Sequence, residues 1–226
     1  MKIYDVAFLG MGASALATAR FKFKGTSSSL IGIDKNFHNN RNNFFAFWLT
    51  DWMKGFDSLA QKKWFSWNFY LTNNHITHET KDLPYCTIRY QDWKEYCLEG
   101  LDNLSIKELN VQSVRNLKKY YEINLDNGEK VFAKKIYDSR TPKLENNKVK
   151  QHFFGYLIDS KQVVNSNSVT LMDFRVGQEM GLHFMYCLPI DENRMLVEST
   201  IFSSEIQEDD WYQKQILEYI ETKLNL

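Results

Sequence analysis

Two glycines near the start of the chain have the spacing of a dinucleotide-binding turn. Gly10 and Gly12 follow the apolar run 6–9, and Ala15 takes the third small position of a G-x-G-x-x-A pattern. In such a turn the first glycine permits a tight bend, and the second lets backbone N–H groups approach a pyrophosphate. The third small residue lets a helix pack on a strand. Asp34 ends the next apolar run, at about the 20-residue spacing expected for a carboxylate that accepts ribose hydroxyl groups. The pattern predicts a dinucleotide site.

The segment after the glycines predicts a helix whose start faces the phosphates. Residues 13–24 are good helix formers, so free N–H groups and a positive dipole end would meet the pyrophosphate. A motif at the N-terminus favours FAD over NAD, because flavoproteins often begin in this way. The alternative is an ordinary β-α-β unit whose glycines serve only a tight turn. The predicted cofactor-binding residues are Gly10, Gly12, Ala13, Ala15, Asp34 and Lys35.

Composition argues against several classes of partner. The chain has 28 basic and 28 acidic residues without a basic patch, so we expect no nucleic acid. No apolar run approaches the roughly 18 residues of a membrane span, and glycines interrupt the N-terminal run, which is unlike a signal peptide. We expect a cytoplasmic protein. Cys86, Cys97 and Cys187 share no C-x-x-C spacing and should be reduced. His75 and His78 have an H-x-x-H spacing without a third ligand, so we predict no metal site.

Hydrophobic patterning predicts helices and strands in the first half of the chain. Strands are expected at 6–9 and 30–33, and residues 36–54 read as a loop that ends in an apolar cluster. Short alternating runs over 64–90 favour strands. Residues 92–104 have helical periodicity, with Trp93, Tyr96, Cys97 and Leu101 on one face.

The second half favours β structure. Segments 120–125 and 130–133 flank an Asn-Gly pair and predict a hairpin, and 136–140 reads as a strand that returns to the first sheet. Further strands are expected at 153–158, 169–174, 182–190 and 194–202. Ser204 and Gln207 form a capping box for a final helix. Its buried face would contain Trp211, Ile216, Leu217, Ile220 and Leu224.

These elements predict an α/β fold, a Rossmann-like FAD-binding domain with an inserted, mainly antiparallel β substrate domain. We expect the FAD-binding part at residues 1–60 and 105–145. The substrate part is expected at 61–104 and 146–204, and a C-terminal helix at 205–226.

Taken together, the segments resemble the flavin-dependent lycopene cyclases of bacteria over most of the chain. The most specific matches are the blocks 151–156, 171–174 and 184–190 with 196–203, in that order and at those distances. The other matching segments are 4–15, 44–48, 56–57, 63–64 and 138–140.

The chain departs from this family at three places. Where such enzymes have Asp-Arg-Thr-Trp, the register from Trp48 places residues 42–45, Asn-Asn-Phe-Phe, with Arg41 displaced by two positions. Ser199 stands where many relatives have a second acidic residue. Relatives also continue beyond residue 226 into a further glycine-rich segment. We therefore expect a fragment, a split subunit or a degenerate relative.

The resemblance implies acid-catalysed closure of the ends of lycopene into β-ionone rings. An enzyme of this type is classified as an intramolecular lyase, a kind of isomerase. It implies Glu198 as the acid, because this carboxyl group lies in an apolar strand on the same face as Leu196 and Thr200. Asp173 is a second candidate. The resemblance further implies reduced FAD, with NAD(P)H as reductant, and peripheral contact with the inner membrane.

Two alternatives stay open at this point. A flavin monooxygenase or dehydrogenase acting on an apolar substrate would share the glycines and Asp34 but would not need Glu198. A truncated relative that merely binds a flavin or a carotenoid would need neither an acid nor turnover.

Overall fold

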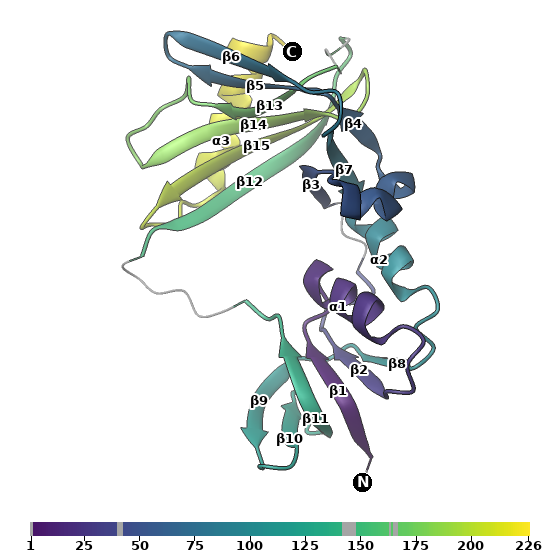
Figure 1. Cartoon of the computed structure of the whole chain (residues 1–226). Helices are drawn as coiled ribbons and strands as arrows, with labels where there is room; N and C mark the ends of the chain where they lie inside the picture. The colour runs from purple at the N-terminus through teal and green to yellow at the C-terminus, as the bar shows by residue number, and fades with distance from the viewer. Residues whose placement is uncertain (1, 40–42, 142–147, 163, 165–166) are drawn as a thin grey trace. The chain divides into compact units, whose positions relative to one another are not determined.

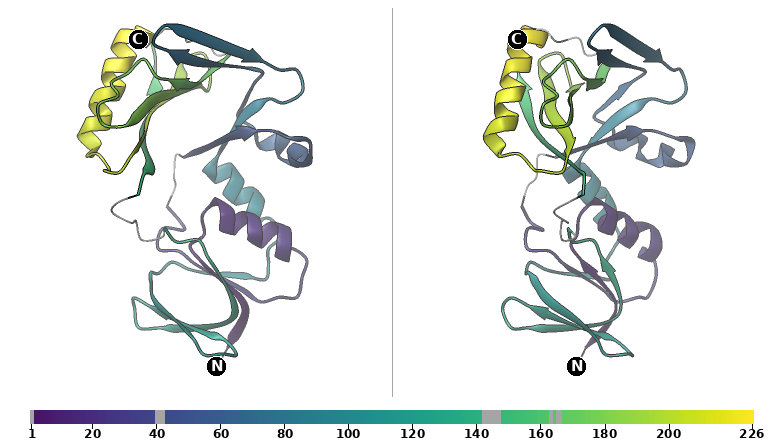
Figure 2. Two further views of the ribbon diagram at one scale, coloured as in Figure 1. Left: turned by 60° about the vertical axis from the view of Figure 1, so that its left-hand side comes forward. Right: turned by 90° about the vertical axis from the view of Figure 1, so that its left-hand side faces the viewer.

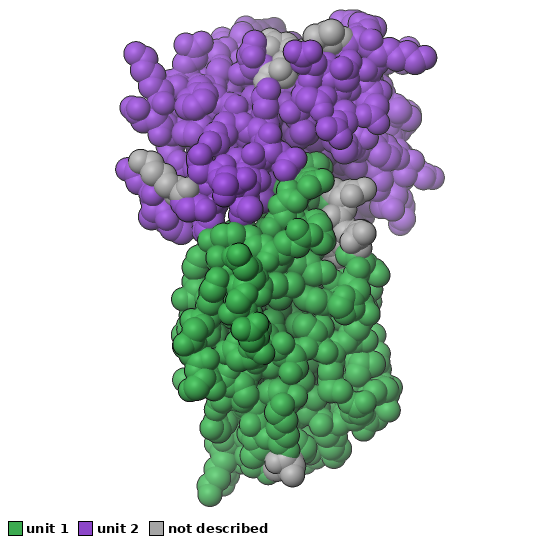
Figure 3. Space-filling model, turned by 90° about the vertical axis from the view of Figure 1, so that its right-hand side faces the viewer, with its two compact units in different colours: residues 1–45, 89–143 green, residues 46–88, 144–226 purple. Residues whose placement is uncertain are grey.

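A computed structural model describes residues 2–39, 43–141, 148–162, 164 and 167–226. The chain forms two compact units (Figure 3). Unit 1 comprises residues 1–45 and 89–143, and unit 2 comprises residues 46–88 and 144–226. Compared with the expected division, residues 46–60 belong to unit 2, and residues 89–104 belong to unit 1. The second difference arises because the helix at Tyr90–Leu98 packs on the helix that follows the glycines. The second stretch of unit 1 also ends at residue 143 and not at 145.

Figure 1 labels the elements along the chain. The α-helices are α1 Ala13–Phe23, α2 Tyr90–Leu98 and α3 Asp209–Tyr219, and two further helical segments are η1 Asp51–Leu59 and η2 Ile220–Leu224. The strands of the first half are β1 Ile3–Leu9, β2 Leu30–Ile33, β3 Phe44–Trp48, β4 Lys62–Trp64, β5 Ser66–Leu71, β6 Asn74–Glu79, β7 Tyr85–Arg89 and β8 Leu104–Lys107. Those of the second half are β9 Val111–Asn116, β10 Tyr121–Leu125, β11 Lys130–Asp138, β12 Lys150–Asp159, β13 Val169–Asp173, β14 Leu182–Pro189 and β15 Arg194–Ser203.

Unit 1 is built on a six-stranded sheet of order β8-β2-β1-β11-β10-β9. Strands β8, β2, β1 and β11 run parallel, and β10 and β9 continue the sheet antiparallel. One core cluster joins Val6 and Phe8 of β1 to α1 and α2, and a second joins Ala7 and Leu9 to β2, β10 and β11. Alternate residues of β1 thus enter two different cores, and the unit has a Rossmann-like arrangement.

Three expectations for residues 36–140 need correction. The predicted helix at 92–104 is α2, which ends at Leu98, because Gly100 adopts a φ of +71° and Leu104 begins a strand paired with Leu30. The expected hairpin is present, with Gly128 at a φ of +85°. The strands expected at 130–133 and 136–140 are not separate. They form the single strand β11, which pairs with β1 over most of its length. The apolar cluster expected at the end of a loop is strand β3.

Unit 2 contains a six-stranded sheet of order β12-β15-β14-β13-β5-β6. All neighbours in it are antiparallel except β13 and β5. A separate three-stranded sheet has the order β3-β7-β4. The mainly antiparallel character of this sheet matches the expectation for the inserted β domain.

The two faces of the unit 2 sheet are covered differently. Helix α3 covers one face of the sheet, which we call the helix face (Figure 2). There, Met185, Cys187 and Val197 pack with Ile216 and Tyr219 of α3. On the opposite face, which we call the aromatic face, sheet residues pack with rings from β4, β5 and β7. The buried members of this cluster are Trp64, Trp67, Tyr85, Val169, Leu171, Leu188 and Ile190.

The final helix begins later than expected. The capping box at Ser204 and Gln207 is wrong, because α3 starts at Asp209 with Glu208 as N-cap residue. The buried residues of α3 are Tyr212, Ile216 and Tyr219, whereas Leu217 is 61% exposed. Within the described residues, no helix is both long enough and apolar enough to cross a membrane.

Candidate functional site

The two glycines after β1 have different structural roles. Gly10 has a φ of +84°, and a Cβ atom there would lie 3.3 Å from Ser139 Oγ, so both backbone and packing favour glycine. A Cβ atom on Gly12 would meet nothing within 4 Å. Gly12 therefore leaves open space beside the start of α1, where a ligand can come close to the protein backbone.

Helix α1 presents its N-terminus at this space. Gly12 is its N-cap residue, and the first intrahelical bond runs from the Leu16 N–H to the Gly12 carbonyl at 3.0 Å. The N–H groups of the first turn precede that bond and attract anions. Ala15 is buried in the same cluster as Val6 and Phe8, where its small side chain permits close packing of helix on strand.

Asp34 lies beside the glycine turn at the end of β2. Its Oδ2 accepts the Met11 N–H at 2.9 Å, and its Oδ1 accepts the Asn36 N–H at 2.9 Å. The carboxylate therefore stabilises the glycine turn from the end of β2.

A pocket of about 380 Å³ joins these groups in unit 1. Exposed Lys35 lies at its edge. Ser139 donates to the Gly10 carbonyl at 3.0 Å, and Arg140 forms two hydrogen bonds with Asp138. Sequence reasoning missed the contribution of the β8–β9 connection, for which the sequence has no motif. The lining residues are Gly10, Gly12, Ile33, Asp34, Lys35, Asn36, Leu109, Asn110, Val111, Ser139, Arg140 and Thr141.

Glu198 lies on the aromatic face of unit 2. Strand register places it opposite Tyr186 on β14 and Gly155 on β12. Burial raises the pKa of its carboxyl group, and the Thr200 hydroxyl, which donates to Glu198 Oε1 at 2.7 Å, partly offsets this rise. Among the described residues, no lysine or arginine forms an ion pair with Glu198. A half-buried carboxyl group in this setting retains its proton to a higher pH than an exposed one.

Aromatic side chains surround this part of the face. The hydroxyl groups of Tyr186 and Tyr85 are hydrogen-bonded at 2.8 Å. The ring of Trp48 lies 4.8 Å from that of Tyr85 and 5.9 Å from that of Trp67, between ring centroids. Burial raises the pKa of both tyrosines, so they stay neutral. The face thus places Glu198 beside several neutral π systems.

Asp173 does not lie near Glu198, because it is on the helix face. It accepts hydrogen bonds from Arg175 at 2.6 and 2.9 Å and from the Tyr219 hydroxyl at 2.7 Å. Burial alone would raise the pKa of Asp173, but these hydrogen bonds outweigh it and lower the pKa below the usual value. Asp173 is therefore an ionised, paired group and is poorly suited to donate a proton.

Ser199 and two histidines of unit 2 also lie away from Glu198. Ser199 is on the helix face, where its hydroxyl meets His183 Nε2 at 2.8 Å, so its side chain points away from the aromatic face. His152 contacts Tyr212 and lies 3.0 Å from Ser203 Oγ. Both histidines have structural partners. Arg41 is outside the described residues.

His75 and His78 lie on strand β6, where residues three apart point to opposite faces. His75 stacks on Tyr70 and His78 on Trp67. The three cysteines are free and buried, and burial raises the pKa of Cys86 to about 11 and of Cys97 and Cys187 to about 12. Thiols with such pKa values react slowly at neutral pH.

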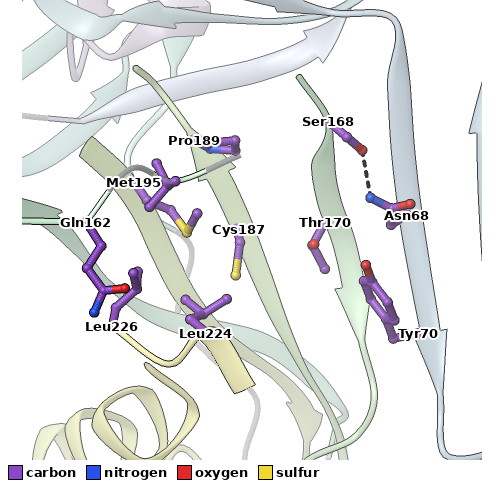
Figure 4. A pocket seen from close by; sticks show the side chains of 11 residues that line it. Asn68, Tyr70, Gln162, Ser168, Thr170, Cys187, Pro189, Met195, Leu224 and Leu226 are labelled. Carbon is purple, nitrogen blue, oxygen red and sulfur yellow. Dashed lines mark hydrogen bonds between the residues drawn. The ribbon is translucent and has the colours of Figure 1, made fainter. Parts of the chain in front are cut away.

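A pocket of about 260 Å³ opens on the helix face of unit 2 (Figure 4). Cys187 and Met195 of the sheet and Leu224 of η2 supply apolar walls, and Thr170 and Asn68 supply polar groups. Asn68 already donates to Ser168 Oγ at 2.6 Å and accepts from Thr77 at 2.7 Å. This pocket and Glu198 are on opposite faces of the sheet.

Solved structures share this fold over nearly the whole chain. A geranylgeranyl bacteriochlorophyll reductase-like protein from Thermoplasma acidophilum aligns with a TM-score of 0.70 at 14% identity, covering 99% of this chain and 62% of that one. A mutant of the halogenase PltM in complex with FAD aligns with a TM-score of 0.68 at 10% identity, covering 99% and 56%. The tetracycline destructase Tet(51) aligns with a TM-score of 0.60 at 12% identity, covering 99% and 64%. The chain thus spans about three-fifths of the length of these structures.

The fold therefore defines a class, the mixed α/β proteins that include a halogenase solved with FAD. Within that class, the sequence profile of the family described as Lycopene cyclase protein matches residues 5–226. The chain belongs to the lycopene cyclase family. A comparison with curated proteins found no match.

Proposed function

We propose that this chain contains the FAD-binding and acid-bearing parts of a lycopene β-cyclase. In this proposal unit 1 binds the cofactor and unit 2 binds the apolar substrate. The observation that supports it most directly is Glu198, a half-buried carboxyl group with a raised pKa on an aromatic face, in a chain of the lycopene cyclase family.

The chemistry requires an acid of this kind. An alkene is a far weaker base than water, so an acid that protonates it must be shielded from water and kept protonated. Glu198 would add its proton to a terminal double bond, and a new carbon–carbon bond would then close the six-membered ring. Loss of a proton from the resulting cation returns a neutral product, so the sum of the steps is an isomerisation.

The surrounding rings would favour the cationic intermediate. A cation over an aromatic face is stabilised by about 0.5–2 kcal/mol per ring, more when water is excluded. Tyr186, Tyr85 and Trp48 supply such faces without introducing a negative charge that could trap the cation. The Thr200 hydroxyl orients the Glu198 carboxyl group.

The glycine turn of unit 1 fits FAD. Open space at Gly12 and the start of α1 at Ala13 suit the pyrophosphate, and Asp34 suits the ribose, with Lys35 at the edge of the same pocket. The buried Ala15 would contribute by letting α1 pack closely on the strand. Reduced FAD, when bound, would supply negative charge that stabilises a developing cation, with NAD(P)H as the reductant that maintains it.

Substitution of Glu198 tests the catalytic proposal. The complete gene is expressed in a bacterial strain that accumulates red lycopene, and the product is read as a shift to orange carotene. Glu198→Gln keeps the size of the side chain but supplies no acidic proton, so cyclisation should fall by at least about 10²-fold. Glu198→Asp should retain a trace, because the acid moves away from its position.

Asp159→Asn is a matched control, since it makes the same acid-to-amide change at an exposed position of β12 on the same face. It should give orange colonies. Orange colonies from Glu198→Gln, at protein and flavin levels equal to the parent, would contradict the assignment.

Substitution of Gly12 tests the cofactor proposal. An added Cβ atom at this position meets nothing within 4 Å, and a valine side chain would occupy the space proposed for the pyrophosphate. Gly12→Val should fold with an unchanged thermal midpoint and purify without yellow flavin. Flavin content equal to the parent would contradict the proposed site.

We also propose that the protein contacts the inner membrane peripherally from the cytoplasmic side. Lycopene resides in the bilayer, and the aromatic composition suits an apolar contact. Flotation with neutral-lipid vesicles at low and high salt checks this proposal. Absence of the protein from the lipid fraction in both conditions would count against it.

A flavin-dependent oxidoreductase acting on an apolar substrate is the second candidate, favoured by the fold shared with the halogenase and the reductase-like protein. That reaction would consume a reductant in proportion to product and would not need Glu198. A ratio of NAD(P)H consumed to product near one, with an active Glu198→Gln variant, would support it over cyclisation.

A further inference from the structure

Gly155 interrupts a row of apolar side chains on strand β12. On the aromatic face, its neighbours along the strand are Phe153 and Leu157, which are 61% and 41% exposed. These neighbours lie about 13 Å apart along the strand, at about 3.3 Å per residue. Because Gly155 has no side chain, the row contains a notch between two exposed apolar groups.

The backbone does not explain the glycine. The φ of Gly155 lies outside the positive region in which glycine is favoured, and the residue is in the middle of a regular ladder with β15. An added Cβ atom would lie 3.4 Å from Glu198 Cβ, 3.5 Å from Glu198 Cγ and 3.5 Å from Leu196 Cδ1, which are ordinary contacts. Glycine weakens a strand interior, and its presence often marks close approach of another group.

The notch lies directly against the acid. Gly155 and Glu198 are paired in the β12–β15 register, and Glu198 is paired with Tyr186 on its other side. The side wall of the notch is therefore the stem of Glu198 together with Leu196, and its ends are Phe153 and Leu157. An apolar group that entered the notch would contact the side chain whose carboxyl group has the raised pKa.

We infer that Gly155 is a specificity-determining position, and that its notch seats the branched alkene end of an apolar polyene against Glu198. This inference rests on the proposed function and names the place where the reacting end of the substrate would bind. Phe153 and Leu157 would hold the end group by apolar contact, and the missing side chain would determine how bulky that end can be.

Filling the notch tests the inference in the complete, flavin-loaded protein. Gly155→Ala and Gly155→Val add one and three carbon atoms beside Glu198. Gln151→Val is the matched control, because it places the same valine on the same face of β12, four residues away. Valine is a good strand former, so all three variants should have thermal midpoints no lower than about that of the parent.

Lycopene binding is measured by quenching of tryptophan fluorescence in a Glu198→Gln background, which prevents turnover. Gly155→Val should weaken binding by about 10–100-fold, Gly155→Ala by less, and Gln151→Val should bind as the background does. In the active protein, KM for lycopene should rise more for Gly155→Val than for Gly155→Ala. The midpoint of the pH–activity profile should be unchanged in Gly155→Ala.

The outcomes separate the inference from the proposed function. If Gly155→Val binds and cyclises lycopene normally while Glu198→Gln is inactive, the notch has no role and the proposed function stands. Normal binding with a shifted pH midpoint would likewise overturn the inference, because Gly155 would then act only through the solvation of Glu198. If the parent does not cyclise lycopene, the proposed function fails, and the binding series still tests the notch.

Discussion

Asp173 and Glu198 are carboxyl groups of one sheet in unit 2, on opposite faces, and their pKa values are shifted in opposite directions. Both groups are removed from water to a considerable degree, and burial by itself raises the pKa of each. Asp173 has Arg175 and Tyr219 as donors, which reverse the effect of burial. Among the described residues, Glu198 has the hydroxyl of Thr200 as a donor, and this bond does not reverse the effect of burial.

The comparison shows that burial alone does not determine the state of a carboxyl group. The hydrogen-bond donors that contact the carboxyl group directly determine whether a buried acid is ionised or keeps its proton. The helix face supplies charged and hydroxyl donors and stabilises the packing of α3. The aromatic face supplies mainly apolar rings and leaves Glu198 with a raised pKa, which is the state that the proposed proton donor requires.

The largest expected effect concerns stability on the helix face. Asp173→Asn removes the anionic acceptor of Arg175 and Tyr219 and should lower the free energy of unfolding by about 3 kcal/mol at pH 7. Urea denaturation measures this change. Asp191→Asn is the matched control, because Asp191 pairs with Arg194 at 2.7 Å but both side chains are exposed, and its midpoint should hardly move.

The pH dependence of the same variant has a defined sign. Since the folded-state pKa of Asp173 is lowered, its stabilisation is present above the unfolded value of 3.8 and is lost as pH falls through the folded-state pKa. The difference between parent and Asp173→Asn should therefore shrink below about pH 3.8. A difference that persists unchanged into strong acid would show that folding does not lower the pKa of Asp173.

A smaller effect of opposite sign is expected at Glu198. Its folded-state pKa is raised, so its contribution to stability is full below the unfolded value of 4.5 and is lost as pH rises through the folded-state pKa. Glu198→Gln removes this loss and should be more stable than the parent at pH 7, although the proposed function predicts that it loses activity. A lower denaturation midpoint for Glu198→Gln at pH 7 would contradict the described environment.

Local patterns predicted much of unit 1. The strand, glycine turn, helix and second strand depend on residues within about 25 positions of each other, and the hairpin at Gly128 depends on an Asn-Gly pair that favours positive φ. The late start of α3 was predictable in principle, because Asp209 and Asp210 in its first turn suit a helix N-terminus. The short strands β8 and β9 were missed because four to six residues give a weak pattern.

The position of Asp173 was not predictable from alternation. Thr170 pairs with Cys187 and Asp173 pairs with Met185, so β13 contains one more residue than its partner between these pairs. Without this irregularity, Asp173 would share a face with Val169 and Leu171, which is the face of Glu198. A single extra residue reverses the side on which the following residues project, and no local signal marks it.

Titration of the two carboxyl groups tests the central claim most directly. The infrared carbonyl band of a protonated carboxyl group is followed against pH in the parent and in Glu198→Gln and Asp173→Asn, and the difference spectra assign each band. The account predicts that the Glu198 band persists to a pH above 4.5 and that the Asp173 band appears only below 3.8. A Glu198 midpoint at or below 4.5 would contradict the claim that the aromatic face holds a proton-donating acid.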